Sequence, residues 1–304
     1  MGEFMPSPLL FEQMRSFVEL AQTLNLSEAV KNLQSTRQTV RRHISYLEEV
    51  RGERLFSLKD RRYALTSAGK RALREAQEVL ARSRAWVQDA SGHRRGLFYL
   101  TAPHDEGFTY FLQQHPLNLM WNSKSDLLPF GLQSWADARG QIEDPGFQAV
   151  RPWMMIFRRH ADDWLCVEVG EKSSFATWYG WERTRSSVGH GIASLPGGSG
   201  FADLLSQPFH ETRTNEGVRL DHIHTRISMP GHDDPVPITY ERLLLGCYFP
   251  DGSGAIAALI NRTYDVKIDG LPQGMARSMP VDQLMTFQMP EHAQNRDRAP
   301  EKGA

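Results

Sequence analysis

The residues best suited to chemistry lie in one short stretch, STRQTVRRHISYLEEVRGERLF, residues 35–56. Val40, Ile44 and Leu47 recur at helical spacing, which predicts a helix with one buried face. Arginine and glutamine side chains fall on the opposite side and its flanks. A helix that buries one face and presents guanidinium and amide groups on the other is suited to bind an anionic, patterned surface.

Two shorter helices are expected to support this one. Residues 8–23 carry an apolar stripe at helical spacing, which predicts the first helix. The second is expected over about residues 28–33, with Ser27 as its N-cap.

The basic helix itself begins after Ser35 or Thr36, runs to about Val50, and is stopped by Gly52. Two short helices and a tight turn before a basic helix are typical of the helix-turn-helix arrangement. In that arrangement the last helix lies in the major groove of DNA and the preceding one crosses the backbone.

A wing and a long helix follow. Residues 55–56 and 63–65 are strand-like pieces around Lys59-Asp60-Arg61-Arg62, which predicts a two-stranded wing with a basic tip. Thr66 is expected to cap a long helix over 67–90. Because that helix has no core large enough to bury its apolar stripe, we expect it to pair with a second copy.

From Phe17 to Leu73 the chain resembles the winged helix-turn-helix domain of LysR-type transcriptional regulators. The matching segments are FVELAQTLNLSEAVKNL, LEEVRGERLF and LTSAGK, in the family's order and without gaps. The chain has Thr36-Arg37-Gln38 where the family usually has Ser-Gln-Pro. The resemblance implies a bacterial transcription regulator that binds double-stranded promoter or operator DNA as a homodimer or a tetramer.

The side chains expected to contact DNA have two roles. Gln38 and Arg42 are assigned to base edges, because glutamine matches adenine and arginine matches guanine through paired hydrogen bonds. Thr36 and the basic wing residues are assigned to phosphates, which position a protein without specifying sequence. The full predicted set is Thr36, Arg37, Gln38, Thr39, Arg41, Arg42, Lys59, Arg61 and Arg62.

Composition fits a DNA-binding head joined to a different second domain. Residues 1–96 hold 17 Lys and Arg against 11 Asp and Glu, whereas the remainder holds 18 against 25. Two cysteines form neither a disulfide framework nor a zinc spacing, and no apolar run reaches transmembrane length. We therefore expect a cytoplasmic protein with no membrane partner.

The rest of the chain departs from the usual periplasmic-binding-protein-like effector domain of the family. Residues 150–268 resemble a PAS domain, since two strands, short helices, a longer helix and a three-strand meander follow in that order, and YERLLLGCYFPDGSGAIAALIN is similar to its final hairpin. The expected fold is α+β: a winged helix-turn-helix over 5–66, a linker and dimerisation helix over 67–90, a connecting segment with at least one helix over 91–149, and a PAS-like five-stranded antiparallel sheet with helices on one face. A tail over 269–304 is expected to be disordered at its end.

A PAS-like domain leaves room for a ligand between sheet and helices, and a small apolar or aromatic effector is one prediction, with ordinary core packing as the alternative. His222 and His224 are expected to face solvent or a partner rather than bind a metal, and no cofactor is expected. The predicted pocket wall is Phe175, Trp178, Tyr179 and Phe209.

Two other functions of the second domain stay open. In one it is a protein-interaction or oligomerisation module that binds no small ligand. In the other it is an enzyme, which a buried acid–base pair with perturbed pKa values in a deep cleft would indicate. The chain has no Gly-x-Ser-x-Gly elbow, phosphate loop or His-Glu-x-x-His motif, so we do not expect an enzyme.

Overall fold

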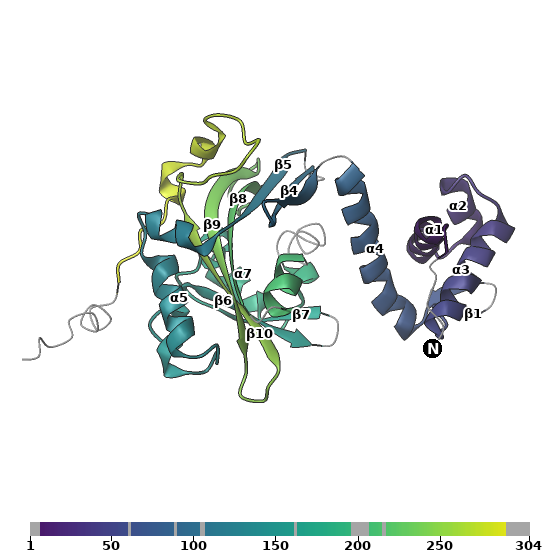
Figure 1. Ribbon diagram of the computed structural model, residues 1–304, viewed down its shortest axis with the longest axis horizontal. Helices are drawn as coiled ribbons and strands as arrows, with labels where there is room; N and C mark the ends of the chain where they lie inside the picture. Colours follow the sequence, from purple (N-terminus) through teal and green to yellow (C-terminus); the bar gives the residue numbers. More distant parts are fainter. Residues whose placement is uncertain are drawn as a thin grey trace, which may run out of the picture. The chain divides into compact units, whose positions relative to one another are not determined.

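The computed structural model describes residues 7–59, 62–87, 90–103, 107–160, 163–195, 207–214 and 217–289. The chain divides into two compact units, residues 1–89 and residues 90–304, and each is described by itself (Figure 1). None of the helices in the described ranges combines the length and the apolar character that a membrane-spanning segment needs.

Three helices form the core of the first unit. α1 spans Leu10–Thr23, α2 spans Leu26–Asn32 and α3 spans Arg37–Arg51. Their apolar faces meet in one cluster around Phe17 and Val40, both of which are buried. The three helices predicted from periodicity are therefore confirmed.

The start of α2 differs from the prediction. The side chain of Asn25 accepts hydrogen bonds from the backbone N–H groups of Ser27 at 3.0 Å and Glu28 at 3.4 Å. Asn25 is therefore the N-cap, and the prediction of Ser27 is wrong because the helix begins at Leu26, two residues earlier than predicted. At the end of α3, Gly52 adopts the left-handed conformation with φ 67°, as the stop signal predicts.

The wing and the long helix have the predicted order. β1 (Phe56–Lys59) pairs antiparallel with β2 (Arg62–Leu65), and the residues between them lie outside the described ranges. α4 (Ser67–Val87) follows, and the Thr66 hydroxyl oxygen accepts a hydrogen bond from the N–H of Gly69 at 2.9 Å. Thr66 therefore caps α4.

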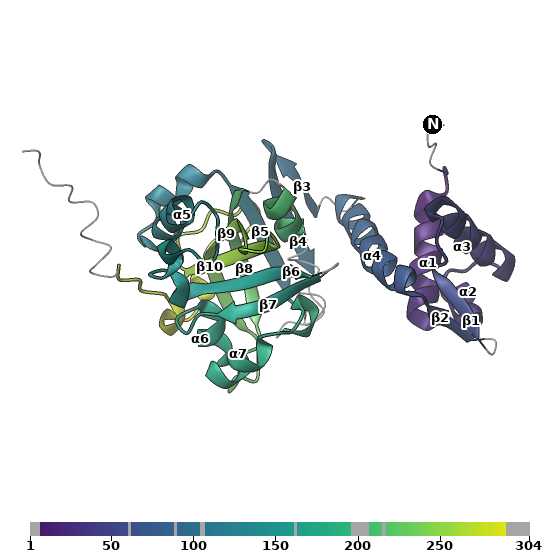
Figure 2. The same ribbon diagram turned by 90° about the horizontal axis from the view of Figure 1, so that it is seen from below.

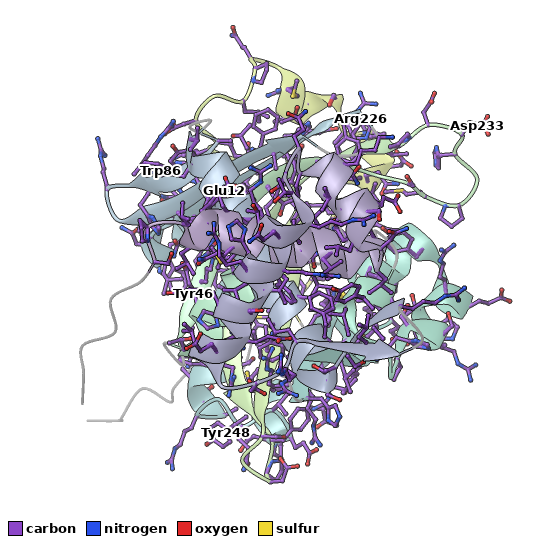
Figure 3. All side chains as sticks on the ribbon, turned by 90° about the vertical axis from the view of Figure 1, so that its right-hand side faces the viewer. Glu12, Tyr46, Trp86, Arg226, Asp233 and Tyr248 are labelled. Carbon is purple, nitrogen blue, oxygen red and sulfur yellow. The ribbon has the colours of Figure 1, made fainter. Side chains whose placement is uncertain are left out.

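The second unit is built on an antiparallel sheet whose eight described strands follow the order β3-β4-β5-β8-β9-β10-β6-β7. The strands are β3 (Ser91–Arg94), β4 (Leu97–Pro103), β5 (Thr109–His115), β6 (Met154–His160), β7 (Asp163–Val169), β8 (Val218–Ile227), β9 (Val236–Tyr248) and β10 (Gly254–Arg262). Arg226 and Asp233 lie towards one end of the domain and Tyr248 towards the other, so the β8–β9 and β9–β10 connections are at opposite ends (Figure 3).

Short helices and 3-10 turns connect and cover these strands, and residues 207–214 are also helical. The helices are α5 (Leu127–Asp137), α6 (Ser174–Tyr179) and α7 (Trp181–Ser187), and the 3-10 turns are η1 (Leu117–Asn122), η2 (Pro145–Phe147), η3 (Arg151–Trp153), η4 (Ile192–Ser194), η5 (Met275–Ser278) and η6 (Val281–Gln283). Figure 2 shows α5 on one side of the sheet and α6 and α7 on the other.

Both faces of the sheet are apolar, because successive side chains of a strand point to opposite faces. Leu243 and Leu245 of β9 pack in one cluster with Leu128 of α5, whereas Leu244 packs in another with Phe175 of α6. The prediction of helices on a single face is therefore wrong.

Residues 91–149 form part of the second unit, so the prediction that they connect two domains is wrong, while the helix predicted among them is present as α5. β3, β4 and β5 extend the sheet beside β8, and Tyr110 and Leu112 of β5 are fully buried. The sequence does not predict these three strands, because stretches such as LFYL, residues 97–100, lack the alternation of apolar and polar residues that marks a half-buried strand.

Residues 269–289 also pack on this unit instead of forming a tail. The Tyr264 hydroxyl donates a hydrogen bond to the carbonyl of Met279 at 2.9 Å, and the Met279 side chain is buried. Phe287 packs edge-on against Trp153 with ring centroids 5.0 Å apart. The predicted tail is wrong for these residues, while the predicted disordered end, 290–304, lies outside the described ranges.

A buried ionic network ties β8 to β9. Asp221 accepts hydrogen bonds from Arg219 Nε at 2.8 Å and from Arg242 Nη2 at 2.8 Å, and all three side chains are buried. Burial alone would raise the pKa of Asp221, but the two guanidinium groups outweigh it and hold that pKa below its ordinary value. Asp221 therefore stays charged and compensates two buried cations.

His222 and His224 point to the face of β8 opposite to Asp221, and both are buried. Their burial contradicts the expectation that they face solvent or a partner. His222 Nδ1 accepts a hydrogen bond from the N–H of Lys267 at 2.8 Å, and His224 Nδ1 lies 2.8 Å from the Thr239 hydroxyl. Burial lowers the pKa of His222 to about 3, with the charge of His115 adding to the effect, and burial lowers that of His224 to about 4.

We expect the second unit to lose stability as the pH falls below about 6.5. Below this pH the unfolded chain binds protons that the buried neutral His222 does not bind, which costs up to about 1.4 kcal/mol per pH unit until its folded pKa of about 3 is reached. His222→Asn, whose oxygen can accept the same N–H, should flatten this dependence.

Urea unfolding at pH 7.5 and 5.0 measures the effect, and tryptophan fluorescence reports it because six of the seven tryptophans lie beyond residue 90. The exposed His210→Asn is the matched control. An equal loss of stability in wild type and His222→Asn would contradict the assignment.

Candidate nucleic-acid interface

The start of α3 is fixed by a side-chain cap. The Thr36 hydroxyl oxygen accepts a hydrogen bond from the N–H of Thr39 at 3.1 Å, and the two threonine hydroxyls lie 2.9 Å apart. Thr36 is exposed at this helix N-terminus, where free backbone N–H groups favour an anion. The predicted phosphate contact of Thr36 fits this position.

The buried face of α3 sets the direction of its basic face. Val40, Ile44 and Leu47 pack in the core, and His43 Nδ1 lies 2.8 Å from the hydroxyl of Ser16 on α1. Burial, with the neighbouring charge of Arg42, lowers the pKa of His43. These contacts fix the rotation of α3 about its axis.

Glu48 joins α3 to the wing. Its Oε1 accepts hydrogen bonds from the backbone N–H groups of Leu55 at 2.9 Å and Phe56 at 3.1 Å, and its Oε2 accepts one from Arg54 at 2.7 Å. The carboxylate is buried, so these donors replace its lost hydration. Glu48 was not among the predicted functional residues, although its position one turn after Ile44 places it on the buried stripe.

The basic face of α3 is open. Arg37, Gln38, Arg41 and Arg42 are all exposed. Arg37 donates a hydrogen bond from Nη2 to the hydroxyl of Ser27 at 2.8 Å, which links α3 to α2. Within the described ranges, no carboxylate lies within 4 Å of Arg41 or Arg42. Their charges and donors are therefore available to a ligand.

The wing contributes further cationic groups. Lys59 and Arg62 are opposite each other in the β1–β2 register, and the Arg62 side chain is exposed. The side chain of Lys59 and the whole of Arg61 lie outside what the structure describes. The structure thus places Arg62 on the wing and leaves the other two wing assignments as predictions.

Gly69 lets α4 approach the wing closely. A Cβ atom on Gly69 would lie 2.0 Å from the carbonyl oxygen of Leu55, far inside van der Waals contact. Because that neighbour is backbone, the glycine cannot be replaced without a shift of α4 relative to Leu55. This explains the glycine of the segment LTSAGK in physical terms.

The four predicted pocket residues lie among the core of the second unit. Phe175 packs against Tyr179 with ring centroids 4.8 Å apart, and Trp178 packs against Tyr240 at 5.8 Å. Phe209 belongs to the same cluster as Phe175. None of the four lines any of three open cavities of this unit, with volumes of about 510, 890 and 480 Å³. The pocket wall therefore stays a prediction.

One buried acid–base pair exists in the second unit. His222 Nε2 lies 3.6 Å from Glu241 Oε1, and burial lowers the pKa of the histidine and raises that of the glutamate. Neither side chain lines any of the three cavities named above. Among the described residues, no group of three ligating side chains could hold a metal ion.

Comparison with known proteins identifies the first unit. Residues 11–70 match the family of bacterial regulatory helix-turn-helix proteins of the lysR type. Over 102 residues the chain is 33% identical to the uncharacterized HTH-type transcriptional regulator YbhD of Escherichia coli strain K12. The matched residues are 33% of this chain and 32% of that protein. Residues 11–70 thus form a LysR-type helix-turn-helix domain.

Two solved structures are similar to part of the chain. CbnR, a LysR family transcriptional regulator, is 29% identical, with 26% of this chain and 29% of CbnR covered and a TM-score of 0.25. Oxidized OxyR of Corynebacterium glutamicum is 23% identical, with 30% and 28% covered and a TM-score of 0.27. The chain spans about a third of the length of the curated relative that it matches.

We expect Glu48→Ala to cost the first unit about 1–3 kcal/mol, because the buried N–H groups of Leu55 and Phe56 would lose their acceptor. Hydrogen exchange of peptides covering residues 45–58, followed by mass spectrometry, measures this local stability. Glu49→Ala is the control, since Glu49 is exposed on the same helix. Equal protection of both variants would refute the role of Glu48.

Proposed function

We propose that this protein is a DNA-binding transcription regulator of the LysR type, whose first unit reads the major groove with α3 and whose second unit is a PAS-like sensor. One observation carries the proposal: on a LysR-type helix-turn-helix domain, the first half of α3 presents the exposed side chains of Arg37, Gln38, Arg41 and Arg42, which have no carboxylate partner in the described ranges. Such a helix can pair with base edges and phosphates.

Different residues of the first unit are suited to contact base edges and phosphates. Gln38 and Arg42 lie on the side of α3 opposite its buried face, from which they can form paired hydrogen bonds with base edges. Arg37 and Arg41 flank them, and Thr36 and Arg62 contribute groups suited to phosphates. Base contacts would give sequence discrimination, and phosphate contacts would give salt-dependent affinity.

Arg42→Ala should weaken binding to the specific site by about 1–3 kcal/mol and relax its discrimination, because an arginine–guanine contact is lost. Arg62→Ala should instead weaken all duplexes to a similar degree and reduce the salt dependence, because a phosphate contact is lost. Fluorescence anisotropy with the selected operator and a random duplex, over a range of salt concentrations, separates the two.

Arg15→Ala is the control, since Arg15 lies on α1 and pairs with Glu12 at 3.1 Å. If Arg42→Ala lowers the affinity for operator and random DNA by the same factor, the base-reading assignment is incorrect.

Homodimer formation through α4 is part of the proposal. Ala72, Ala76 and Leu80 of α4 are buried in the core of the first unit. Val79 and Trp86, one heptad apart, are 44% and 74% exposed. An apolar stripe of this kind on a long helix is suited to pack against the same stripe of a second copy.

Trp86→Ser should raise the dimer dissociation constant roughly tenfold or more, since a tryptophan at the centre of such an interface carries several kcal/mol of apolar burial. Sedimentation equilibrium of the full chain measures the constant. Glu75→Ala, at an exposed position of the same helix, should leave it unchanged. An unaltered constant for Trp86→Ser would rule out this interface.

The order of elements in the second unit supports the PAS-like assignment. The hairpin β6–β7 is followed by α6, α7 and the helix at 207–214, and then by the meander β8-β9-β10. β10 returns to pair with β6. The three strands β3, β4 and β5 and the helix α5 are additions to that plan. In this proposal a signal at the second unit shifts the population of arrangements in which two heads fit their half-sites.

A second candidate has an observation in its favour. Phe175, Trp178 and Phe209 pack in the core, where the sensor hypothesis needs space for a ligand. Dense packing between the sheet and these helices favours a second unit that serves as an assembly module, joined to the same DNA-binding head. Both candidates share the DNA-binding function, so the Arg42 experiment tests the part that they have in common.

A further inference from the structure

An open cavity of about 480 Å³ lies where the end of β10 meets the C-terminal segment of the second unit. Residues 123–125 form one wall, residues 261–265 form a second, and residues 284–287 with Arg277 form a third. The volume is in the range that holds a small molecule. None of the predicted pocket residues belongs to it, so it is a different site.

Arg262 is the unusual side chain of this cavity. It is only 6% exposed, and its Nη1 donates a hydrogen bond to Gln283 Oε1 at 3.3 Å. Its Nε has no hydrogen-bond partner among the described residues, and no carboxylate there lies within 4 Å of it. A buried cation with so little compensation is costly to the folded chain.

The pKa of Arg262 reflects the same imbalance. Burial lowers it to about 10, and the attraction of Asp282 offsets this only in part. By contrast, burial would also lower the pKa of Arg242, but Asp221 raises it above its ordinary value. Among the described residues, no carboxylate pairs with Arg262 as Asp221 pairs with Arg242.

The rest of the lining is also cationic on balance. Asp265 is the single acidic residue of the lining, and its carboxylate pairs with Lys124 at 2.9 Å. Arg277 is exposed at the rim. Three cationic side chains thus face one carboxylate, and an anion placed among them would be attracted.

Polar and apolar groups restrict what the anion is. Asn261 is buried and donates to Glu241 Oε2 at 2.7 Å, while its Oδ1 has no partner among the described residues. Leu284, Met285 and Phe287 supply an apolar wall, which Trp153 holds by packing on Phe287. An anion with an apolar body complements this lining.

We propose that this cavity binds a small organic anion whose carboxylate pairs with Arg262 and whose apolar part lies against Leu284 and Phe287. The bound anion compensates the buried guanidinium and joins the segment 277–287 to the end of β10. The inference rests on this cavity alone and does not depend on the PAS-like assignment or on DNA binding.

Isothermal titration of the full chain with benzoate and, separately, with inorganic phosphate tests the proposal. Benzoate should bind saturably at one site per chain and more tightly than phosphate, because only benzoate has an apolar body. Arg262→Gln should weaken benzoate roughly tenfold or more, as expected for the loss of a charge-assisted hydrogen bond. Arg183→Gln, at an exposed position of α7, should bind benzoate as wild type does.

Circular dichroism establishes whether Arg262→Gln is folded. If it is not, Arg277→Gln at the exposed rim serves in its place, and it should weaken benzoate by a smaller factor. Absence of saturable benzoate binding to wild type, or equal binding by the wild type and the folded Arg262→Gln, would overturn the proposal. Equal affinity for phosphate would overturn the assignment of an organic anion.

Discussion

The first unit depends on one buried carboxylate. Glu48 accepts hydrogen bonds from the backbone N–H groups of Leu55 and Phe56 at the start of the wing, so α3 and the wing are held together by one side chain. A buried carboxylate is stable only with such donors, and the backbone N–H groups are satisfied only by such an acceptor. The same Leu55 whose N–H is bound here offers its carbonyl oxygen to the Thr66 hydroxyl and comes within reach of Gly69. Helix, wing and α4 therefore meet at one point.

The second unit also buries charged side chains, and it compensates them with ion pairs. Asp221 compensates Arg219 and Arg242 inside the sheet, and each pair is held by a hydrogen bond of 2.8 Å. Removal of either partner of such a pair leaves a buried charge and is strongly destabilising. Arg262 lies in the same domain with no such partner among the described residues. Arg219 and Arg242, which have a carboxylate partner, belong to a structural network. Arg262, which has none among the described residues, belongs to the proposed binding site.

Local patterns made the head predictable from sequence. Helical periodicity and the Gly52 stop depend on a few neighbouring residues, and both are confirmed. The predicted cap of α3 was Ser35 or Thr36, and the structure shows Thr36. Long-range pairing was not readable in this way. β3, β4 and β5 pair with one another locally, but their place in the sheet depends on the pairing of β5 with β8, more than a hundred residues away. The packing of Met279 depends on Tyr264 and the sheet. The alternation of His222 with Ile223 indicates two faces of the strand. His222 is buried because His115 of β5 and Lys267 of the C-terminal segment contact it, and the alternation does not indicate either contact.

The most direct test of the DNA-reading account is selection of duplexes from a random pool by the full chain, followed by sequencing. The account predicts an inverted repeat whose half-sites lie about one helical turn, or a multiple of it, apart, because two copies of α3 would occupy successive major grooves of one face. It also predicts that a chain with Arg42→Ala tolerates more sequences at the enriched positions. Recovery of duplexes with no common motif would show that the exposed face of α3 binds DNA without reading it.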